Sequence, residues 1–431
     1  MDRDRIVALD KQRVWHPYTP MDRYRAEVDP IVVARAEGPY LWDVDGSRLI
    51  DANSSWWVAS LGHNHPRLVQ ALKDQADRNC HSALAGMTHQ PASELAERLC
   101  AVAPDGLEHV FYSDDGSTAV EVALKVTLQY WAQAGQTKRK HFVALQEAFH
   151  GETLGVTAIG GVDVFRAPFK GAVLENFFVP TPTQAGGLEP AVDALRSVLD
   201  AHGDELSAVV VEPVVQGASG MQMYDPAYLR EVRELCDRHD VFLVFDEVFT
   251  GYGRTGPMWA ADHAGVLPDI LCTAKGFSGG MLPMAATLVT PRLFEGFLGD
   301  ADRAFYYGHS FCGNPLGSAI AVEVLKVYEE EHILDRAKPK AERIGEAFRA
   351  LEALPAVART RNRGMIGALD LAGDDGYLAQ AGWRIYDEAR RRGAYLRPMG
   401  NVVYVAPPLN IDDDVLVELL GIVADSIEAV S

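Results

Sequence analysis

The sequence predicts an α/β protein with a large domain built on a mostly parallel sheet and a smaller α+β domain. Short runs in the middle of the chain are apolar at consecutive positions and are separated by helix-length segments. This is the pattern of parallel strands that are buried on both faces. Beyond residue 325 the pattern changes to amphipathic helices with few strands, which is typical of a second unit. A length of 431 residues leaves room for two or three compact units.

Six strands are expected in the large domain, because each run is rich in β-branched or aromatic residues and is bounded by polar or turn-forming residues. A long helix that residues 115–118 precede is expected between the first two of these strands, within the stretch that ends at residue 131. Helices of this kind make the crossover connections that parallel strands need. The expected strands cover 108–114, 140–146, 206–214, 239–247, 269–275 and 285–290.

The smaller domain is expected to combine helices with short strands. Its expected elements are helices over 338–354, 383–393 and 413–430 and strands over 365–372 and 401–406. We expect the first residues of the chain to return to this domain. The predicted division is therefore an N-terminal segment at 1–51, a large domain at 52–325 and a C-terminal small domain at 326–431.

Composition excludes several classes of function. Forty basic and sixty acidic residues give a formal charge of −20, which disfavours binding to nucleic acid or to anionic lipid. No apolar run approaches the roughly 20 residues that span a bilayer, and the charged start does not resemble an export signal, so we expect a cytoplasmic protein. The odd number and wide spacing of the cysteines argue against disulfides. They are Cys80, Cys100, Cys236, Cys272 and Cys312.

A lysine and an aspartate each stand at the end of an expected buried strand. Asp246 ends the run "VFLVFD" and Lys275 ends "DILCTAK". Ligands of open α/β sheets bind beyond the carboxyl ends of the strands, so both side chains should face one crevice. A partly desolvated lysine can bond to an aldehyde, and a buried aspartate can keep a ring nitrogen protonated. Pyridoxal 5′-phosphate (PLP) needs this pair, so Lys275 and Asp246 are the predicted catalytic residues.

Two segments could bind the phosphate of such a cofactor. Gly116 and Ser117 open the long expected helix, where backbone N–H groups favour an anion. Gly308 and Ser310 lie in the Gly-punctuated stretch "YYGHSFCGNP", which offers a second, weaker phosphate contact. Ordinary helix capping explains the first segment equally well.

Aromatic and histidine side chains complete the predicted cofactor site. Phe149 and His150 follow the strand expected at 140–146, so Phe149 could stack on a flat ring, although an aromatic residue there is more often part of the core. His63 and His65 in "GHNHP" lie two residues apart without a neighbouring carboxylate cluster, so we expect no metal site.

Several motifs together resemble one family. The segments "FDEVFTGYGRTG" and "PDILCTAKGFSGGMLPMAA" are similar to the signature of the class III aminotransferases, which are PLP enzymes of fold type I. The resemblance extends from "LWDVDGSRLIDANSSWW" to "GNVVYVAPPL". It implies that Lys275 binds the cofactor covalently and that Asp246 faces the pyridine nitrogen. It also implies that Val248 packs on one face of the ring and Phe149 on the other.

Within this class the chain resembles the subfamily of biotin biosynthesis that aminates 8-amino-7-oxononanoate. S-adenosyl-L-methionine is the expected amino donor, and lysine is the alternative. The motifs that carry this resemblance are "WHPYTPM", "NSSWW", "YGHSFCGNPLG" and "YLRPMGNVVYVAPPL". It implies a homodimer with shared active sites, in which Gly308 and Ser310 reach the neighbouring subunit's cofactor. The residues that it places on the substrate are Tyr18, Trp56, Trp57, Glu152, Gly308 and Arg397, with the Arg397 guanidinium on the substrate carboxylate.

Three positions depart from this subfamily, and three alternative functions stay open. Phe149 stands where many members have tyrosine, which keeps ring stacking and loses a hydroxyl contact. Glu152 stands where many have aspartate and is one methylene longer, and Asp115 stands where some have serine. Trp56 and Trp57 could instead be core residues.

The alternative functions are amination of another ω-amino acid or diamine, a PLP aminomutase, and a non-catalytic regulator. A regulator would need a DNA-binding extension, and a net charge of −20 disfavours binding to DNA.

Overall fold

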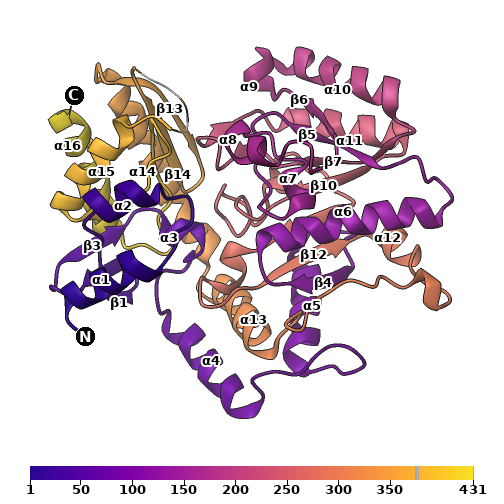
Figure 1. Cartoon of the computed structure of the whole chain (residues 1–431), viewed down its shortest axis with the longest axis horizontal. Coiled ribbons are helices and arrows are strands. Elements are labelled where there is room, and N and C mark those ends of the chain that lie inside the picture. The colour runs from indigo at the N-terminus through magenta and orange to yellow at the C-terminus, as the bar shows by residue number, and fades with distance from the viewer. Residues whose placement is uncertain (374–375, 377, 431) are drawn as a thin grey trace.

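The computed structural model describes residues 1–373, 376 and 378–430 (Figure 1). Its largest sheet has seven strands. The order across the sheet is β4-β12-β11-β10-β7-β5-β6. The strands are β4 (His109–Ser113), β5 (His141–Leu145), β6 (Phe177–Val179), β7 (Leu206–Val211), β10 (Phe242–Asp246), β11 (Ile270–Thr273) and β12 (Ala285–Val289). The six strands expected from the sequence are all present. The seventh, β6, has only three residues, and its signal is too short to detect.

The sheet is mixed because β12 runs antiparallel to both of its neighbours, β11 and β4. The other neighbouring strands pair in parallel. No long crossover helix separates β11 from β12, so the chain reverses direction between them. All residues of β7 and β10 are buried, which explains why their sequences do not alternate between apolar and polar. The predicted α/β fold class is confirmed.

Helices cover both faces of this sheet. Helix α6 (Gly116–Gln133) packs Val120 and Ala123 in one apolar cluster with strand residues such as Val244. A second, larger cluster contains buried residues from the helices on the other face. These helices are α5 (Gln90–Val102), α10 (Leu188–His202), α11 (Ala227–His239) and α13 (Pro315–Glu330). The central strands are thereby shielded from water on both sides.

The C-terminal part contains a three-stranded antiparallel sheet, in the order β13-β14-β16. Its strands are β13 (Val357–Arg363), β14 (Ile366–Leu371) and β16 (Val402–Val405), and its long helices are α14 (Ile333–Ala350), α15 (Ala381–Arg392) and α16 (Asp413–Val430). Strand β13 was not expected, because its sequence VARTRNR is rich in arginine, and only one of its residues is buried. In Figure 1 the three helices lie together on the left of the molecule.

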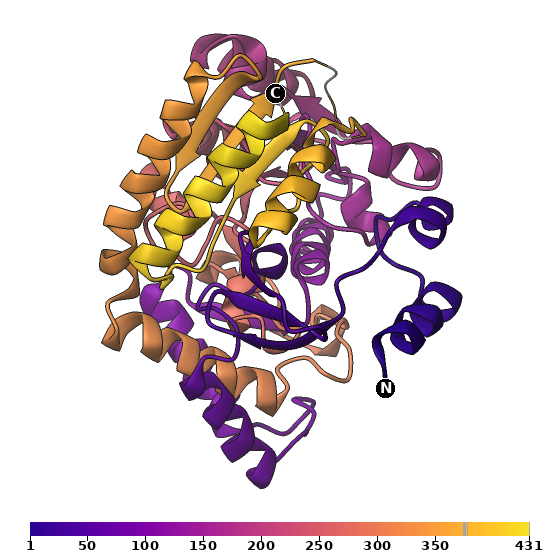
Figure 2. The ribbon, with the colours of Figure 1, turned by 90° about the vertical axis from the view of Figure 1, so that its left-hand side faces the viewer.

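The first residues of the chain join this C-terminal part. Strands β1 (Val33–Glu37), β2 (Tyr40–Asp43) and β3 (Arg48–Asp51) form a sheet with β15 (Ala394–Tyr395), which pairs in parallel with β3. Figure 2 shows the indigo N-terminal strands beside the yellow C-terminal elements. Helix α13 runs without a break through residues 325 and 326. We therefore propose that the division between the two larger parts falls at the C-terminal end of α13.

The remaining elements are short helices and hairpin strands. None of the helices among the described residues is long and apolar enough to cross a membrane. These elements are α1 (Arg3–Arg13), α2 (Met21–Glu27), α3 (Ser54–Trp57), α4 (Pro66–Arg78), α7 (Leu154–Thr157), α8 (Asp163–Arg166), η1 (Ala167–Phe169), α9 (Pro182–Ala185), β8 (Val215–Gln216), β9 (Gln222–Met223), η2 (Ala260–His263), η3 (Lys275–Ser278), α12 (Pro291–Glu295), η4 (Ala301–Arg303) and η5 (Leu351–Ala353).

Candidate active site

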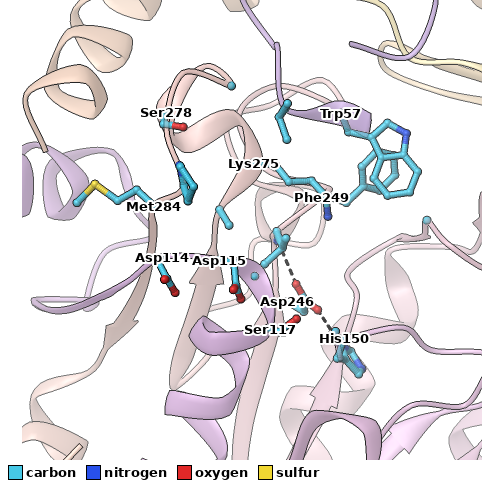
Figure 3. A pocket seen from close by; sticks show the side chains of 18 of the residues that line it. Trp57, Asp114, Asp115, Ser117, His150, Asp246, Phe249, Lys275, Ser278 and Met284 are labelled. Atoms are coloured by element: carbon cyan, nitrogen blue, oxygen red, sulfur yellow. Dashed lines mark hydrogen bonds and ion pairs between the residues drawn. The ribbon is translucent and has the colours of Figure 1, made fainter. Parts of the chain in front are cut away.

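A cavity of about 430 Å³ lies beyond the carboxyl ends of β10 and β11 (Figure 3). Parallel strands bring the residues that follow them to one edge of the sheet, where ligands of α/β proteins bind. Eight residues predicted from the sequence line this cavity. They are Trp57, Gly116, Ser117, Phe149, His150, Asp246, Val248 and Lys275.

Asp246 lies at the bottom of the cavity and has only 4% of its surface exposed. Its Oδ1 accepts a hydrogen bond from the backbone N–H of Val248 at 3.0 Å, and its Oδ2 pairs with Nδ1 of His150 at 2.8 Å. Figure 3 shows both contacts as dashed lines. Two fixed contacts leave the carboxylate little freedom to turn, so its position in the cavity is set by the protein.

His150 and Glu212 form the buried surroundings of Asp246. Burial alone would lower the pKa of His150, but the hydrogen bond to Asp246 and the charges of Asp246 and Glu212 outweigh it and raise this pKa. Burial raises the pKa of Glu212 to about 7, against the charge of His150. The Glu212 carboxylate accepts hydrogen bonds from the backbone N–H groups of Phe149 and Gly217, both at 3.0 Å. The cluster therefore favours a protonated imidazole beside Asp246.

Lys275 follows β11 and carries its amine into the same cavity. Its φ of 49° lies in the left-handed region, which is uncommon for a residue other than glycine and occurs often at functional sites. Burial lowers the pKa of Lys275, although the negative charges of Asp246 and Glu212 act in the opposite direction. Its Nζ lies 5.1 Å from the ring centroid of Trp57. A lysine amine that loses its proton readily is a nucleophile near neutral pH.

The N-terminus of α6 forms another wall of the cavity. Asp115 and Thr118 cap this 18-residue helix reciprocally, and its first two residues, Gly116 and Ser117, line the cavity. Gly116 packs so tightly that an added Cβ would lie 2.6 Å from Cγ1 of Val248. Ser117 accepts a hydrogen bond through its Oγ from the backbone N–H of Glu152 at 3.0 Å. A helix N-terminus of this length favours a bound anion such as phosphate.

These residues fit PLP. Lys275 presents an amine for the aldehyde, Asp246 a carboxylate for the ring nitrogen, and the N-terminus of α6 a phosphate-binding edge. The second ring nitrogen of His150, Nε2, is buried without a hydrogen-bond partner among the described residues. When bound, PLP supplies a protonated ring that withdraws electrons from the carbon attached to the transferred nitrogen.

The two tryptophans lie in a backbone turn of unusual conformation. Ser54, Ser55, Trp56 and Trp57 have φ angles of 53°, 47°, 65° and 72°, so α3 is one turn of left-handed helix. Each such residue costs roughly 1–2 kcal/mol relative to the right-handed form. Trp57 is 9% exposed and packs 4.4 Å from the Phe249 ring, whereas Trp56 is 38% exposed. Trp57 is therefore both a core residue and a wall of the cavity.

Arg397 lies between the indole rings of Trp56 and Trp383. Its guanidinium carbon is 5.1 Å from the ring centroid of Trp56 and 5.3 Å from that of Trp383. Within the described part of the chain it forms no ion pair, so it is not held by an acidic neighbour. In particular, Glu212 is hydrogen-bonded to backbone groups and does not pair with Arg397. A half-buried cation between two indoles is thus available to an external carboxylate.

Tyr18 and Glu152 also lie beside the tryptophan turn. The Tyr18 hydroxyl donates a hydrogen bond to Oε1 of Glu152 at 2.5 Å, and its ring centroid is 5.5 Å from that of Trp56. Glu152 is exposed, and the residue before it, Gly151, lines the cavity. Four predicted substrate residues therefore lie close together. Tyr18 and Arg397 contact the indole of Trp56, and Glu152 contacts Tyr18.

Gly308 and Ser310 do not line this cavity. Both are exposed, and the segment that carries them is attached through His309, whose Nε2 lies 3.3 Å from Oδ1 of Asp114. His63 and His65 are paired with Asp51 and Glu331. No group of three or more possible metal ligands occurs among the residues that the structure describes.

Sequence reasoning missed Glu212 and Phe249 as parts of the cavity. Glu212 directly follows the fully buried strand β7, at the same sheet edge as Asp246. A charged residue after a buried strand is the same signal that identified Asp246, so Glu212 could have been found. Phe249 could not, because an aromatic residue after a strand is usually part of the core.

Several known proteins are similar to this chain in sequence. The family model "Aminotransferase class-III" matches residues 23–427. The adenosylmethionine-8-amino-7-oxononanoate aminotransferase of Nitratidesulfovibrio vulgaris is 42% identical over 99% of this chain and 82% of its own length. The enzyme of the same name from Geobacter sulfurreducens is 38% identical, with 95% of this chain and 94% of the relative covered.

Solved structures of aminotransferases are also similar to this chain. The crystal structure of adenosylmethionine-8-amino-7-oxononanoate aminotransferase from Methanocaldococcus jannaschii matches with a TM-score of 0.95 and 34% identity, over 99% of both chains. A PLP-bound amine transaminase from an uncultivated Pseudomonas species matches with a TM-score of 0.91 and 31% identity, over 97% of this chain and 99% of its own. From its sequence and its fold, the chain belongs to the PLP-dependent class III aminotransferase family.

Proposed function

We propose that this protein transfers an amino group to 8-amino-7-oxononanoate, giving 7,8-diaminononanoate in biotin biosynthesis, with S-adenosyl-L-methionine as the donor. Relatives named for this reaction are similar over nearly the whole chain. Donor and acceptor use the same site in turn, in a ping-pong mechanism with PLP as the carrier of the amino group.

The observation that carries this proposal is the unpaired guanidinium of Arg397 beside the tryptophan turn. The acceptor has a carboxylate at the far end of an apolar chain, and the donor has a carboxylate of its own. A guanidinium binds a carboxylate through two parallel hydrogen bonds. Trp56 lies against Arg397, and the neighbouring Trp57 lies against Lys275. The indoles thus connect the carboxylate-binding end with the reacting end.

Three groups of the chain act at the reacting end. Lys275 would hold the cofactor and, as a neutral amine at Nζ, would accept a proton from the substrate carbon and return it to the carbon on the other side of the transferred nitrogen. Asp246 stabilises positive charge on the ring nitrogen, and His150 fixes the orientation of this carboxylate through its 2.8 Å contact. The lowered pKa of Lys275 favours the neutral amine that this role requires.

The aromatic walls exclude water and accept two dissimilar substrates. Trp56, Trp57 and Tyr18 provide flat apolar surfaces with few rotatable bonds, on which an alkyl chain or an adenine ring can pack. Tyr18 is fixed by Glu152 and by its edge contact with Trp56. In this arrangement Glu152 also provides a negative charge near the sulfonium and amino groups of the donor.

We also propose a homodimer in which Gly308 and Ser310 bind the phosphate of the neighbouring subunit's cofactor and Gly308 contacts its substrate. Both residues are exposed and lie outside the cavity of their own chain. Tyr306 and Phe311, on the same segment, are 79% and 59% exposed, which suits a surface that a second copy covers. A monomer at working concentration in light scattering would contradict this proposal.

We place the protein in the cytoplasm, since its five cysteines carry free thiols.

The decisive experiment is an assay of the purified protein, with PLP, 8-amino-7-oxononanoate and one amino donor at a time. We expect 7,8-diaminononanoate to form with S-adenosyl-L-methionine and not with lysine. Structures named as ω-transaminases are also similar, at 26% identity. Turnover of simple ω-amines with pyruvate, without amination of 8-amino-7-oxononanoate, would therefore replace the proposed function by that one.

A further inference from the structure

The left-handed turn at Ser54–Trp57 is held by contacts from outside the turn. A run of four non-glycine residues with positive φ does not persist on local preference, because L-residues visit this region singly. Strained backbone of this kind persists only where surrounding contacts over-determine it. The contacts that fix the turn therefore also fix where its two indoles point.

Asp51 contacts the turn through Ser55 and contacts the residue before the turn, Asn53. Asp51 ends β3, is completely buried, and accepts hydrogen bonds from three groups. Its Oδ2 accepts from Oγ of Ser55 and contacts Nε2 of His63, both at 2.8 Å, and its Oδ1 accepts from the backbone N–H of Asn53 at 3.3 Å. Within the described part of the chain, His63 is the only residue that forms an ion pair with Asp51.

The two ends of this network are rigid. His63 is held against Gly38 by two backbone hydrogen bonds, of 2.7 and 2.9 Å. On the other side, the Asn53 side chain accepts a hydrogen bond from the backbone N–H of Trp56 at 2.9 Å. Ser54 donates through its Oγ to the carbonyl oxygen of Ala406 at 2.8 Å. The turn is thus tied to β3, to the segment after it and to the C-terminal part.

The turn contacts both ends of the substrate site. Trp57 lies beside the amine of Lys275, and Trp56 lies beside the guanidinium of Arg397. A relaxation of the turn toward a right-handed or extended backbone would move both indoles, because each φ would change sign. The carboxylate-binding end would then lose its alignment with the reacting end.

We propose that Asp51, held by His63, is a positioning residue that fixes the left-handed turn and thereby sets the affinity for the keto-acid substrate. Asp51 does not line the cavity, so it acts through Trp56 and Trp57 and not by contact with substrate or cofactor. The consequence for the substrate depends on the proposed function, whereas the effect on the turn does not.

The test compares Asp51→Asn and Ser55→Ala with a matched control, Asp43→Asn. Asp43 also ends a strand of the N-terminal sheet and accepts hydrogen bonds from two backbone N–H groups, but it does not contact the turn. With PLP-loaded protein, each of the first two variants should raise KM for 8-amino-7-oxononanoate roughly tenfold, with kcat changed less than threefold, because each loses a charged hydrogen bond. Asp43→Asn should stay within about twofold of wild type.

A double variant checks that the two residues act together. Because Asp51→Asn and Ser55→Ala weaken the same hydrogen bond, the combined KM should exceed that of Asp51→Asn by less than about twofold. Fully multiplied effects would contradict a shared network. If Asp51→Asn does not fold, Ser55→Ala alone must still raise KM, and an unchanged KM in that variant refutes the proposal. A lower melting temperature with unchanged KM would show a structural role only.

Hydrogen–deuterium exchange separates this inference from the proposed function. The amide of Trp56 is protected by its hydrogen bond to Asn53, so a peptide covering 51–62 should exchange faster in Asp51→Asn than in wild type or Asp43→Asn. This measurement needs no turnover. Faster exchange in a protein that does not aminate 8-amino-7-oxononanoate would overturn the function and keep the positioning role. Unchanged exchange would overturn the positioning role, whatever the substrate.

Discussion

Replacement of Arg397 by alanine is the most direct test of carboxylate recognition. The guanidinium lies between two indoles, at 5.1 and 5.3 Å, and has no ion-pair partner among the described residues. A hydrogen bond that involves a charged group contributes about 1.5–3 kcal/mol, and 1.36 kcal/mol corresponds to a factor of ten. Because Arg397 is only half-buried, we expect a loss of one to two orders of magnitude.

Arg397→Ala should therefore raise KM for 8-amino-7-oxononanoate by about 10- to 100-fold and leave the absorbance of bound PLP unchanged. Arg397→Lys should recover only part of this loss, because an ammonium group does not form the planar two-point contact. Arg35→Ala is the matched control, since the guanidinium of Arg35 also lies over an indole, 3.8 Å from the ring of Trp42, on the N-terminal sheet.

The methyl ester of the keto acid separates charge recognition from general binding. Wild type should prefer the free acid strongly, whereas Arg397→Ala should bind acid and ester almost equally. If the alanine variant keeps the wild-type preference for the acid, the carboxylate is bound by another residue and our reasoning about Arg397 is wrong.

Four further outcomes are expected. Lys275→Ala should lose the visible absorbance of lysine-linked PLP, and a borohydride-reducible link at another lysine would contradict the assignment. Asp246→Asn should keep PLP bound but lose most turnover, because a neutral amide does not hold the ring nitrogen protonated; near-normal kcat would refute this role. Gly116→Ala should weaken PLP binding in equilibrium dialysis, because its Cβ would lie 2.6 Å from a valine side chain, whereas Gly421→Ala, with no atom within 4 Å of the added Cβ, should not. Burial raises the pKa of Glu247 to about 7 from an ordinary 4.5, so the folded state keeps this proton longer than the unfolded state and this contribution to stability falls as pH rises from 4.5 to 7. Urea unfolding of Glu247→Gln should show a smaller decrease across that window than wild type, and equal slopes would contradict the assignment.

The sequence by itself determined the fold class and the core of the site. Strands with few exposed residues leave a local, continuous apolar signal, so six of the seven strands of the large sheet were predicted from short windows. The position of Lys275 and Asp246 at the ends of two such strands places them in one crevice, because parallel strands meet the same sheet edge with their carboxyl ends. Capping residues predicted the start of α6 for the same local reason.

Only the tertiary structure decided the features that depend on distant partners. Strands β6, β13 and β15 are short or charged, and they form because a neighbouring strand supplies hydrogen bonds. The sequence "SSWW" contains no signal for a left-handed turn, since local preference opposes it. Contacts from Asp51 and Ala406, the latter more than 300 positions away, stabilise the turn. The unpaired state of Arg397 is likewise a property of the folded chain, because ion pairs depend on distances that no local pattern records.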